Sequence, residues 1–293
     1  MAYINTIEKT QMINILTDSI ADIPDDLLTK YCIETIPMYV QLNGSVYKDG
    51  KNITPDEILK SVEMAGVYPT TSAPPPSDFI KYFNRRDPSI FIGVSGQFST
   101  TMKNAQIAQQ ELDSKNIELI DSRSISIGYG QVVLQAAKWR DEGMGFRELV
   151  ERIRELIITS RGIFILNSLE YLYHGGRCSA IDHIASSLLK IRPFQNLNPD
   201  GTLGVLKKVR GSRNKAVKEL FNYFRNQYSA YDIKHISIGH LDCYDEATFL
   251  KNKIRGLGYQ NEILITKIGC VLASHSGPNP LGIAFSISEN GTL

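Results

Sequence analysis

Hydroxyl side chains and a histidine lie in two proline-rich loops of this sequence. The segment 69–76 contains four prolines in eight residues and carries three consecutive hydroxyl residues, 70–72. Proline fixes φ and has no N–H, so we expect a stiff extended loop there, neither the interior of a helix nor a central strand. His275 lies in a second glycine- and proline-rich loop, residues 273–280. Such loops suit the binding of a small polar group, although a plain connector whose hydroxyls bond their own backbone is the alternative.

Polar residues also follow several expected strands. These strand ends are Asp18-Ser19, Ser95 to Ser99, and Asp121-Ser122. In largely parallel sheets, ligands bind beyond the carboxyl ends of the strands. Hydroxyls, backbone amides and imidazole all donate hydrogen bonds, so a cluster of them suits one small anionic head group. The side chains expected to meet around it are Thr71, Ser72, Ser95 and His275.

A serine–histidine hydrolase is the main rival, with Ser95 or Ser99 as nucleophile and His275 as base. The GxSxG elbow of many such enzymes does not occur in the sequence. Phosphate-binding glycine motifs are also absent, and no acidic cluster has the spacing of magnesium ligands. The other histidines share no metal-ligand spacing; they are His174, His183, His235 and His240. The sequence therefore predicts no metal, no cofactor and no catalytic residue.

Composition limits the class of protein. The chain has 293 residues, a net charge of +1 and 42% hydrophobic residues, which fits two ordinary domains and gives no sign of nucleic-acid binding. Its four cysteines form no CxxC pair, so we expect neither a zinc site nor a disulfide framework. The first residues lack the apolar run of a signal peptide, and no stretch approaches ~18 apolar residues. A cytoplasmic protein is the expectation.

The first half alternates strands and helices, which predicts a largely parallel sheet flanked by helices. The expected strands are 13–16, 36–42, 89–94 and 117–120; the expected helices start near 23 and 54 and span 99–112, 128–140 and 145–159.

The second half is expected to be mixed α/β with a hairpin. Its expected strands are 163–166, 192–197, 203–209, 233–239, 263–267, 270–273 and 282–287; its expected helices are 180–189, 212–228 and 245–256, with a glycine-broken turn at 171–177. We expect two domains in direct contact, 1–160 and 161–293.

Short motifs occur along the chain in an order typical of one family. They are Thr17-Asp-Ser19, Tyr47-Lys-Asp-Gly50, Thr71-Ser-Ala-Pro74, Ser95-Gly-Gln-Phe-Ser99, Ile120-Asp-Ser122, Leu169-Glu-Tyr-Leu172 with Gly175-Gly-Arg177, Lys190-Ile-Arg-Pro193, Asp200-Gly201, Lys208-Val-Arg210 with Lys215-Ala216, and His275-Ser-Gly-Pro278. From about Ile13 to its end, the chain resembles the DegV family of bacterial fatty-acid-binding proteins.

This resemblance implies a two-domain, DegV-like (EDD-type) α/β fold that holds one long-chain fatty acid in a buried tunnel. The acyl tail would lie in the first domain and the carboxylate near the domain junction. The residues implied at the carboxylate are Thr71, Ser72, Ser95, Ser99, His275 and Gly277. The resemblance also implies a substrate-presenting role: a separate, ATP-dependent fatty acid kinase subunit would convert the bound acid to an acyl phosphate. Contact with a membrane would be transient, for ligand exchange.

Four further residues would lie near the exposed head group or serve kinase docking: Arg177, Arg210, Asp18 and Ser19. Ordinary surface charge is the alternative for the two arginines. The chain departs from the family's usual residues at Ala73, Gly96, Thr100 and Asn279-Pro280. These departures leave the proposed donors in place but alter the loops near the head group, which bears on the identity of the kinase partner.

Overall fold

A parallel sheet forms the centre of the first half, as the alternation predicted. The computed structural model describes residues 12–177 and 191–288. The strand order of this sheet is β2-β1-β6-β7, and every pair is parallel. Its strands are β1 (Asn14–Asp18), β2 (Ile33–Ile36), β6 (Ser89–Gly93) and β7 (Ile117–Asp121). The crossovers contain the 3₁₀ turn η1 (Ser19–Ala21) and the helices α1 (Asp25–Lys30), α3 (Pro76–Phe83) and α4 (Thr101–Glu111).

A small antiparallel sheet contains the proline-rich segment. Its strand order is β4-β3-β5, and its strands are β3 (Tyr39–Leu42), β4 (Ser45–Lys48) and β5 (Thr70–Ser72). The expected strand 36–42 was wrong in its extent, because Pro37 has no N–H and separates β2 from β3. Segment 69–76 is extended as expected, but it forms an edge strand and then begins α3 at Pro76.

Six strands form the mixed sheet of the second half, in the order β10-β9-β8-β13-β11-β12. They are β8 (Ser160–Ile165), β9 (Ile191–Leu197), β10 (Leu203–Arg210), β11 (Ile233–His240), β12 (Ile263–Lys267) and β13 (Leu281–Ile287). The hairpin β9–β10 confirms that prediction. Two helices, α8 (Arg213–Ala230) and α9 (Tyr244–Arg255), pack on this sheet.

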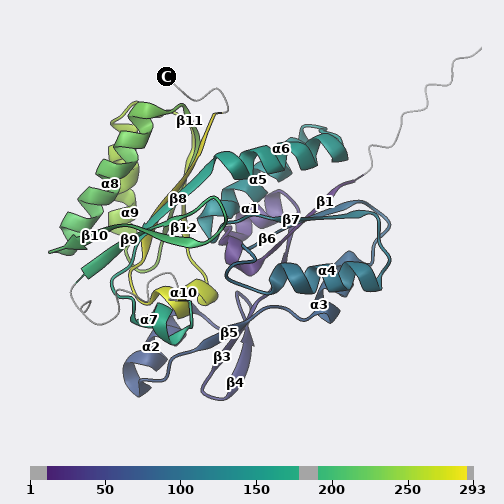
Figure 1. Ribbon diagram of the computed structural model, residues 1–293, viewed down its shortest axis with the longest axis horizontal. Helices are drawn as coiled ribbons and strands as arrows, with labels where there is room; N and C mark the ends of the chain where they lie inside the picture. Colours follow the sequence, from purple (N-terminus) through teal and green to yellow (C-terminus); the bar gives the residue numbers. More distant parts are fainter. Residues whose placement is uncertain (1–11, 178–190, 289–293) are drawn as a thin grey trace, which may run out of the picture.

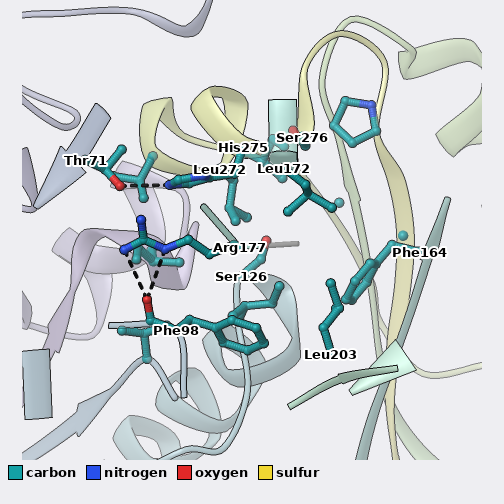
Figure 2. A pocket seen from close by; sticks show the side chains of 18 of the residues that line it. Thr71, Phe98, Ser126, Phe164, Leu172, Arg177, Leu203, Leu272, His275 and Ser276 are labelled. Atoms are coloured by element: carbon teal, nitrogen blue, oxygen red, sulfur yellow. Dashed lines mark hydrogen bonds between the residues drawn. The ribbon is translucent and has the colours of Figure 1, made fainter. Parts of the chain in front are cut away.

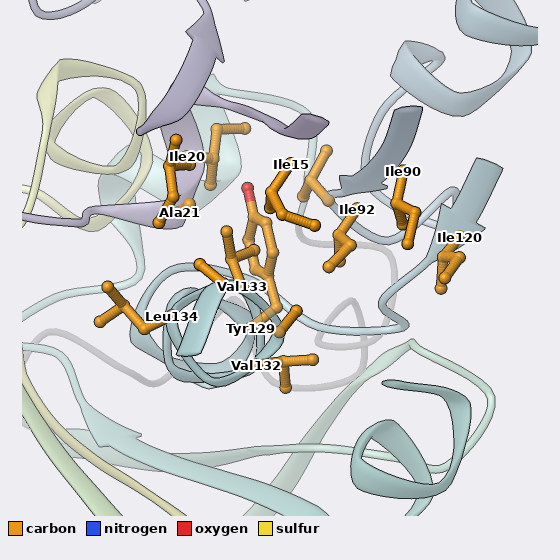
Figure 3. Close-up of a cluster of buried hydrophobic side chains, with 14 of the residues drawn as sticks. Ile15, Ile20, Ala21, Ile90, Ile92, Ile120, Tyr129, Val132, Val133 and Leu134 are labelled. Carbon is orange, nitrogen blue, oxygen red and sulfur yellow. The ribbon is translucent and has the colours of Figure 1, made fainter. Parts of the chain in front are cut away.

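Helices and sheets alternate in layers (Figure 1). Helices α3 and α4 cover one face of the parallel sheet, and α8 and α9 cover the outer face of the mixed sheet. Between the sheets lie α5 (Ile127–Asp141) and α6 (Phe146–Thr159). Because α5 contacts both sheets, it is buried on nearly every side, and Figure 3 shows Tyr129 of this helix among isoleucines of the parallel sheet. The mixed α/β architecture agrees with the expected fold class.

Three further expectations differ from the structure. Residues 270–273 were predicted as a strand, but they belong to helix α10 (Cys270–Ser276). His275, expected in a loop at 273–280, lies on the same helix. The turn expected at 171–177 begins as helix α7 (Glu170–His174). The expected helix 180–189, together with His183, lies outside the described residues. The domain boundary at residue 160 stays a prediction, although the parallel and mixed sheets meet there in sequence.

The remaining helix of the first half, α2 (Pro55–Ala65), has the start that its sequence predicts. Thr54 accepts a hydrogen bond from the Glu57 N–H, and the Glu57 carboxylate accepts one from the Thr54 N–H. Within residues 12–177 and 191–288, no helix has both the length and the apolar run needed to cross a bilayer.

Candidate functional site

A mostly apolar cavity lies between the two halves of the chain. Its volume is about 120 Å³, which is room for about four water molecules at about 30 Å³ each. The apolar side chains that line it come from both halves: Ile20, Met38, Val94, Phe98, Ile125, Ile127, Phe164, Leu166, Leu172, Leu203, Ile268, Val271, Leu272 and Leu281. A pocket of this kind, with few polar groups, is typical of a site for an apolar ligand.

Three polar side chains of the lining, Thr71, Arg177 and His275, lie at one side of the cavity. Thr71 Oγ1 and His275 Nε2 are 2.8 Å apart, so strand β5 and helix α10 meet there through a hydrogen bond. Figure 2 shows this pair and Arg177 on one side, with Phe164 and Leu203 on the other. His275 is only 8% exposed. Its burial, reinforced by the charge of Arg177, lowers its pKa to about 4, so the imidazole is neutral near pH 7.

Arg177 provides the positive charge at this side. Its guanidinium donates from Nη1 to the Gly175 carbonyl at 2.8 Å and from Nη2 to the Phe98 carbonyl at 3.3 Å. No carboxylate among the described residues forms an ion pair with it. These hydrogen bonds hold the guanidinium group in place and leave other N–H donors free for an anion. This geometry suits carboxylate binding.

Buried carboxylates fix helix α10, which carries His275. Asp22 Oδ1 accepts a hydrogen bond from Gly269 N at 2.7 Å, and Asp49 Oδ1 accepts one from Cys270 N at 2.9 Å. These N–H groups at the start of the helix therefore have partners. Asp22 also accepts from the hydroxyl of Ser126, which lines the cavity with a left-handed φ of 54°.

Asp18 is enclosed at the end of β1. Its carboxylate accepts hydrogen bonds from Ile20 N at 3.0 Å, Val94 N at 2.8 Å and the Tyr129 hydroxyl at 2.6 Å. Burial nevertheless raises its pKa from 3.8 to about 6. Asp18 therefore connects β1 with α5 and with the residue that follows β6. It does not line the cavity.

The stability that Asp18 contributes should depend on pH. Because its pKa is raised to about 6, the folded chain keeps a proton that the unfolded chain releases. Its contribution is complete below about pH 4 and is lost as the pH rises through about 6. Two pKa units correspond to about 3 kcal/mol. By urea denaturation, the difference in unfolding free energy between wild type and Asp18→Asn should be larger near pH 4 than near pH 7. A difference that stays constant over this range contradicts the account.

Gly175 leaves the space that His275 occupies. A Cβ at position 175 would lie 2.1 Å from His275 Nδ1, although the backbone there (φ −76°, ψ −4°) suits any residue. Gly175→Ala should therefore push the imidazole out of its buried position, and the pKa of His275 should rise from about 4 toward its usual ~6.5. An NMR titration of the ring measures this shift. Gly145→Ala, which meets nothing within 4 Å, is the control and should leave the ring's pKa unchanged.

The structure brings only some of the predicted site residues to the cavity. Those that line it are Thr71, Ser72, Ser99, Arg177 and His275. Ser95 is 0% exposed and lies outside the lining; its hydroxyl donates to the Gly201 carbonyl at 2.9 Å. Its role at a carboxylate stays a prediction, for which that bond would have to break.

The other predicted residues do not line the cavity. Gly277 has a φ of 68°, and a Cβ there would lie 2.5 Å from the ring of Tyr171, so it ends α10 beside α7. Ser19 Oγ accepts a hydrogen bond from Met38 N at 3.0 Å. Arg210 is exposed at the end of β10 and does not line the cavity. The head-group and docking roles of Asp18, Ser19 and Arg210, and the carboxylate role of Gly277, stay predictions.

Sequence reasoning missed several residues that shape this site. Phe98 contributes both an apolar wall and the carbonyl that binds Arg177. Asp22 and Asp49 position α10, but their partners lie more than 200 residues away in sequence. Phe98 and Asp49 occur within two of the quoted family motifs, but nothing in those motifs indicates a contact with Arg177 or with α10.

Hydrolytic chemistry has little geometric support. Within the part of the chain that the structure describes, neither Ser95 nor Ser99 hydrogen-bonds to His275; Ser99 Oγ is instead 2.7 Å from Thr101 Oγ1. The buried Nδ1 of His275 has no partner there, so no acid orients the ring as a base requires. Among the same residues, no group of three or more His, Cys, Asp or Glu could hold a metal ion.

Solved structures share this fold. A fatty-acid-binding DegV family protein from Thermus thermophilus superposes with a TM-score of 0.87 at 29% identity, covering 94% of this chain and 100% of that one. A Thermotoga maritima protein described as having a fatty acid binding function superposes with a TM-score of 0.80 at 26% identity. The match covers 95% of this chain and 100% of that one. The fatty acid kinase (Fak) B3 protein of Streptococcus pneumoniae, loaded with linoleic acid, superposes with a TM-score of 0.84 at 22% identity. The match covers 94% of this chain and 100% of that one, and it shows the shared fold.

Sequence comparisons point the same way. A DegV domain-containing protein of Caldanaerobacter subterraneus is 34% identical over 279 residues, which cover 94% of this chain and 99% of that protein. The model of the family described as "Uncharacterised protein, DegV family" matches residues 12–288. This match takes in all but the two ends of the sequence, so the chain belongs to the DegV family.

Proposed function

We propose that this chain binds one long-chain fatty acid, with the carboxylate beside Thr71, His275 and Arg177 and the tail in the apolar cavity. The observation that carries the proposal is the one-sided cavity: Thr71, His275 and Arg177 supply hydrogen-bond donors and a cation at one side, and most of the remaining lining is apolar. The fatty-acid-binding relatives from Thermus thermophilus and Thermotoga maritima support it. The tail would be enclosed by both halves of the chain, not by the first domain alone.

Burial of the tail supplies the affinity. Each buried methylene contributes about 0.8 kcal/mol, so a sixteen-carbon chain gains about 12 kcal/mol before the costs of association. Such a chain is larger than the present cavity of about 120 Å³, so we expect the apolar walls to open as it enters. A carboxylate needs several donors when it leaves water. Thr71 and neutral His275 supply one hydrogen bond each, for which their present bond to each other would have to open. Arg177 supplies the compensating charge.

The carboxylate end is the end nearest solvent. Ser72 is exposed, and Thr71, Ser99 and Arg177 are half-buried, whereas Leu166, Leu172 and Leu203 of the apolar walls are buried. A head group held there is accessible to a second protein. We therefore propose that the chain presents the carboxylate to a separate ATP-dependent kinase subunit, which forms the acyl phosphate, and that Arg210 serves the docking surface.

Lipid extraction tests the binding proposal. The purified protein is denatured and extracted with organic solvent, and the extract is analysed by mass spectrometry. About one fatty acid per chain is expected, with no release of acid from added acyl esters. Ester hydrolysis that disappears in a Ser95→Ala variant would support the hydrolase instead.

A reconstituted phosphorylation assay tests presentation. The chain, loaded with a labelled fatty acid, is incubated with ATP and a fatty acid kinase subunit, and hydroxylamine traps the acyl phosphate as a hydroxamate. The product should appear only when both proteins are present. Product formed by this chain and ATP alone would show catalysis by the chain itself and refute the presenting role.

A further inference from the structure

One polar side chain interrupts the apolar wall of the cavity far from its charged side. Gln195 lies on β9 and lines the cavity, and it pairs in the sheet with Phe164 of β8 and Val205 of β10. Successive residues of a strand point to opposite faces. The preceding residue, Phe194, packs in the core beneath α8, so Gln195 faces the cavity. An apolar residue would ordinarily occupy such a position.

The amide nitrogen of Gln195 is buried without a partner. The residue is 1% exposed, and its Nε2 makes no hydrogen bond to any residue that the structure describes. Its sheet neighbours Phe164 and Val205 offer only apolar side chains, as does Leu203 nearby in the lining. A buried donor without an acceptor destabilises the folded chain. The fold therefore gives no reason for an amide here, whereas a polar group on a ligand would give one.

The position of Gln195 limits the group that it could bind. Figure 2 places Phe164, its partner in the sheet, across the cavity from Thr71, His275 and Arg177. A carboxylate held by those three residues is therefore not the partner of the amide. Arg177 is the cation of the described lining, and it lies across the cavity from Phe164, the sheet partner of Gln195. With no described cation on that side to balance an anion, the partner has to be a neutral group along the acyl chain.

A hydroxyl group matches the amide best. The amide offers an N–H donor and a carbonyl acceptor, and a hydroxyl both accepts and donates. A carbon–carbon double bond offers only a weak π acceptor, and a saturated chain offers nothing. We infer that Gln195 makes the cavity selective for a long-chain fatty acid that carries a hydroxyl group along its chain. This inference rests on the proposed fatty-acid binding.

Ligand competition tests the selectivity. Binding of stearic acid, oleic acid and a series of monohydroxystearic acids with the hydroxyl at different carbons is measured by calorimetry on the delipidated full chain. At least one hydroxy acid should bind wild type about tenfold more tightly than stearic acid. This is the difference expected when the buried amide of Gln195 is hydrogen-bonded in the first complex and unpaired in the second. Gln195→Met, which keeps an unbranched side chain without the amide, should abolish this preference and bind stearic acid more tightly than wild type does.

A matched control separates the cavity from the general effect of the substitution. Gln131 of α5 is also a buried glutamine whose amide has no partner among the described residues, but it lies outside the lining of this cavity. Gln131→Met should keep the wild-type preference. Thermal melts show whether both variants fold. If one does not fold, the relative affinities of wild type for the acids still test the inference.

The outcomes are distinct. Wild type that binds stearic acid as tightly as every hydroxy acid overturns the inference, as does a preference that survives Gln195→Met. Oleic acid as the tightest ligand overturns the hydroxyl assignment. Failure of every acid to bind wild type overturns the proposed function and this inference together, whereas equal binding of all acids overturns the inference alone.

Discussion

A Thr71→Val variant is expected to bind a long-chain fatty acid about 10- to 100-fold more weakly than wild type. Valine keeps the shape and the strand preference of threonine but removes the hydroxyl that lies 2.8 Å from His275 Nε2. A hydrogen bond to a charged group contributes about 1.5–3 kcal/mol, which corresponds to this loss. Displacement of a fluorescent fatty acid measures the affinity.

Thr70→Val is the matched control for this result. Thr70 precedes Thr71 on the same strand, is exposed and does not line the cavity. The same change of chemistry there should leave the affinity within about twofold of wild type, as for an exposed surface substitution. Equal losses in the two variants would mean that β5 as a whole, and not the hydroxyl of Thr71, determines binding.

A Gly130→Ala variant is expected to lose roughly 3 kcal/mol of unfolding free energy, near the upper end for overpacking of a core. A Cβ at this position of α5 would lie 2.1 Å from the carbonyl oxygen of Ala21, a backbone atom that cannot rotate away. Helix α5 would have to move away from η1. Chemical denaturation measures the loss.

The sign of this effect is informative, because alanine inside a helix is ordinarily the better residue by about 1 kcal/mol. An increase in the stability of Gly130→Ala would therefore contradict the close contact between α5 and η1. Gly145→Ala, at an open position before α6, should change the unfolding free energy by less than about 0.5 kcal/mol.

Elements with local signals were predictable from the sequence. Helix α2 begins at the proline that follows its capping residue Thr54, and the β9–β10 hairpin turns at Asp200-Gly201. Helix α10 was not predictable, because its first N–H groups bind Asp22 and Asp49 from the other half of the chain. A four-residue apolar run gives no local sign of such partners.

The site was also predictable only in part, because several of its contacts join residues far apart in the sequence. The expected meeting of Thr71 and His275 agrees with their 2.8 Å contact, although their role at a carboxylate stays a prediction. Ser95 was expected beside them, but its hydroxyl binds the carbonyl of Gly201 in the hairpin. The polarity of Gln195 gave no indication that it faces a cavity, because the face of a strand depends on register and packing.

A structure of the complex with palmitic acid tests the central claim most directly. The proposed function predicts one carboxylate oxygen within hydrogen-bond distance of both Thr71 Oγ1 and His275 Nε2, with the Arg177 guanidinium alongside. The tail should extend between Phe98 and Phe164. A carboxylate bound elsewhere, or a tail outside this cavity, would contradict the claim.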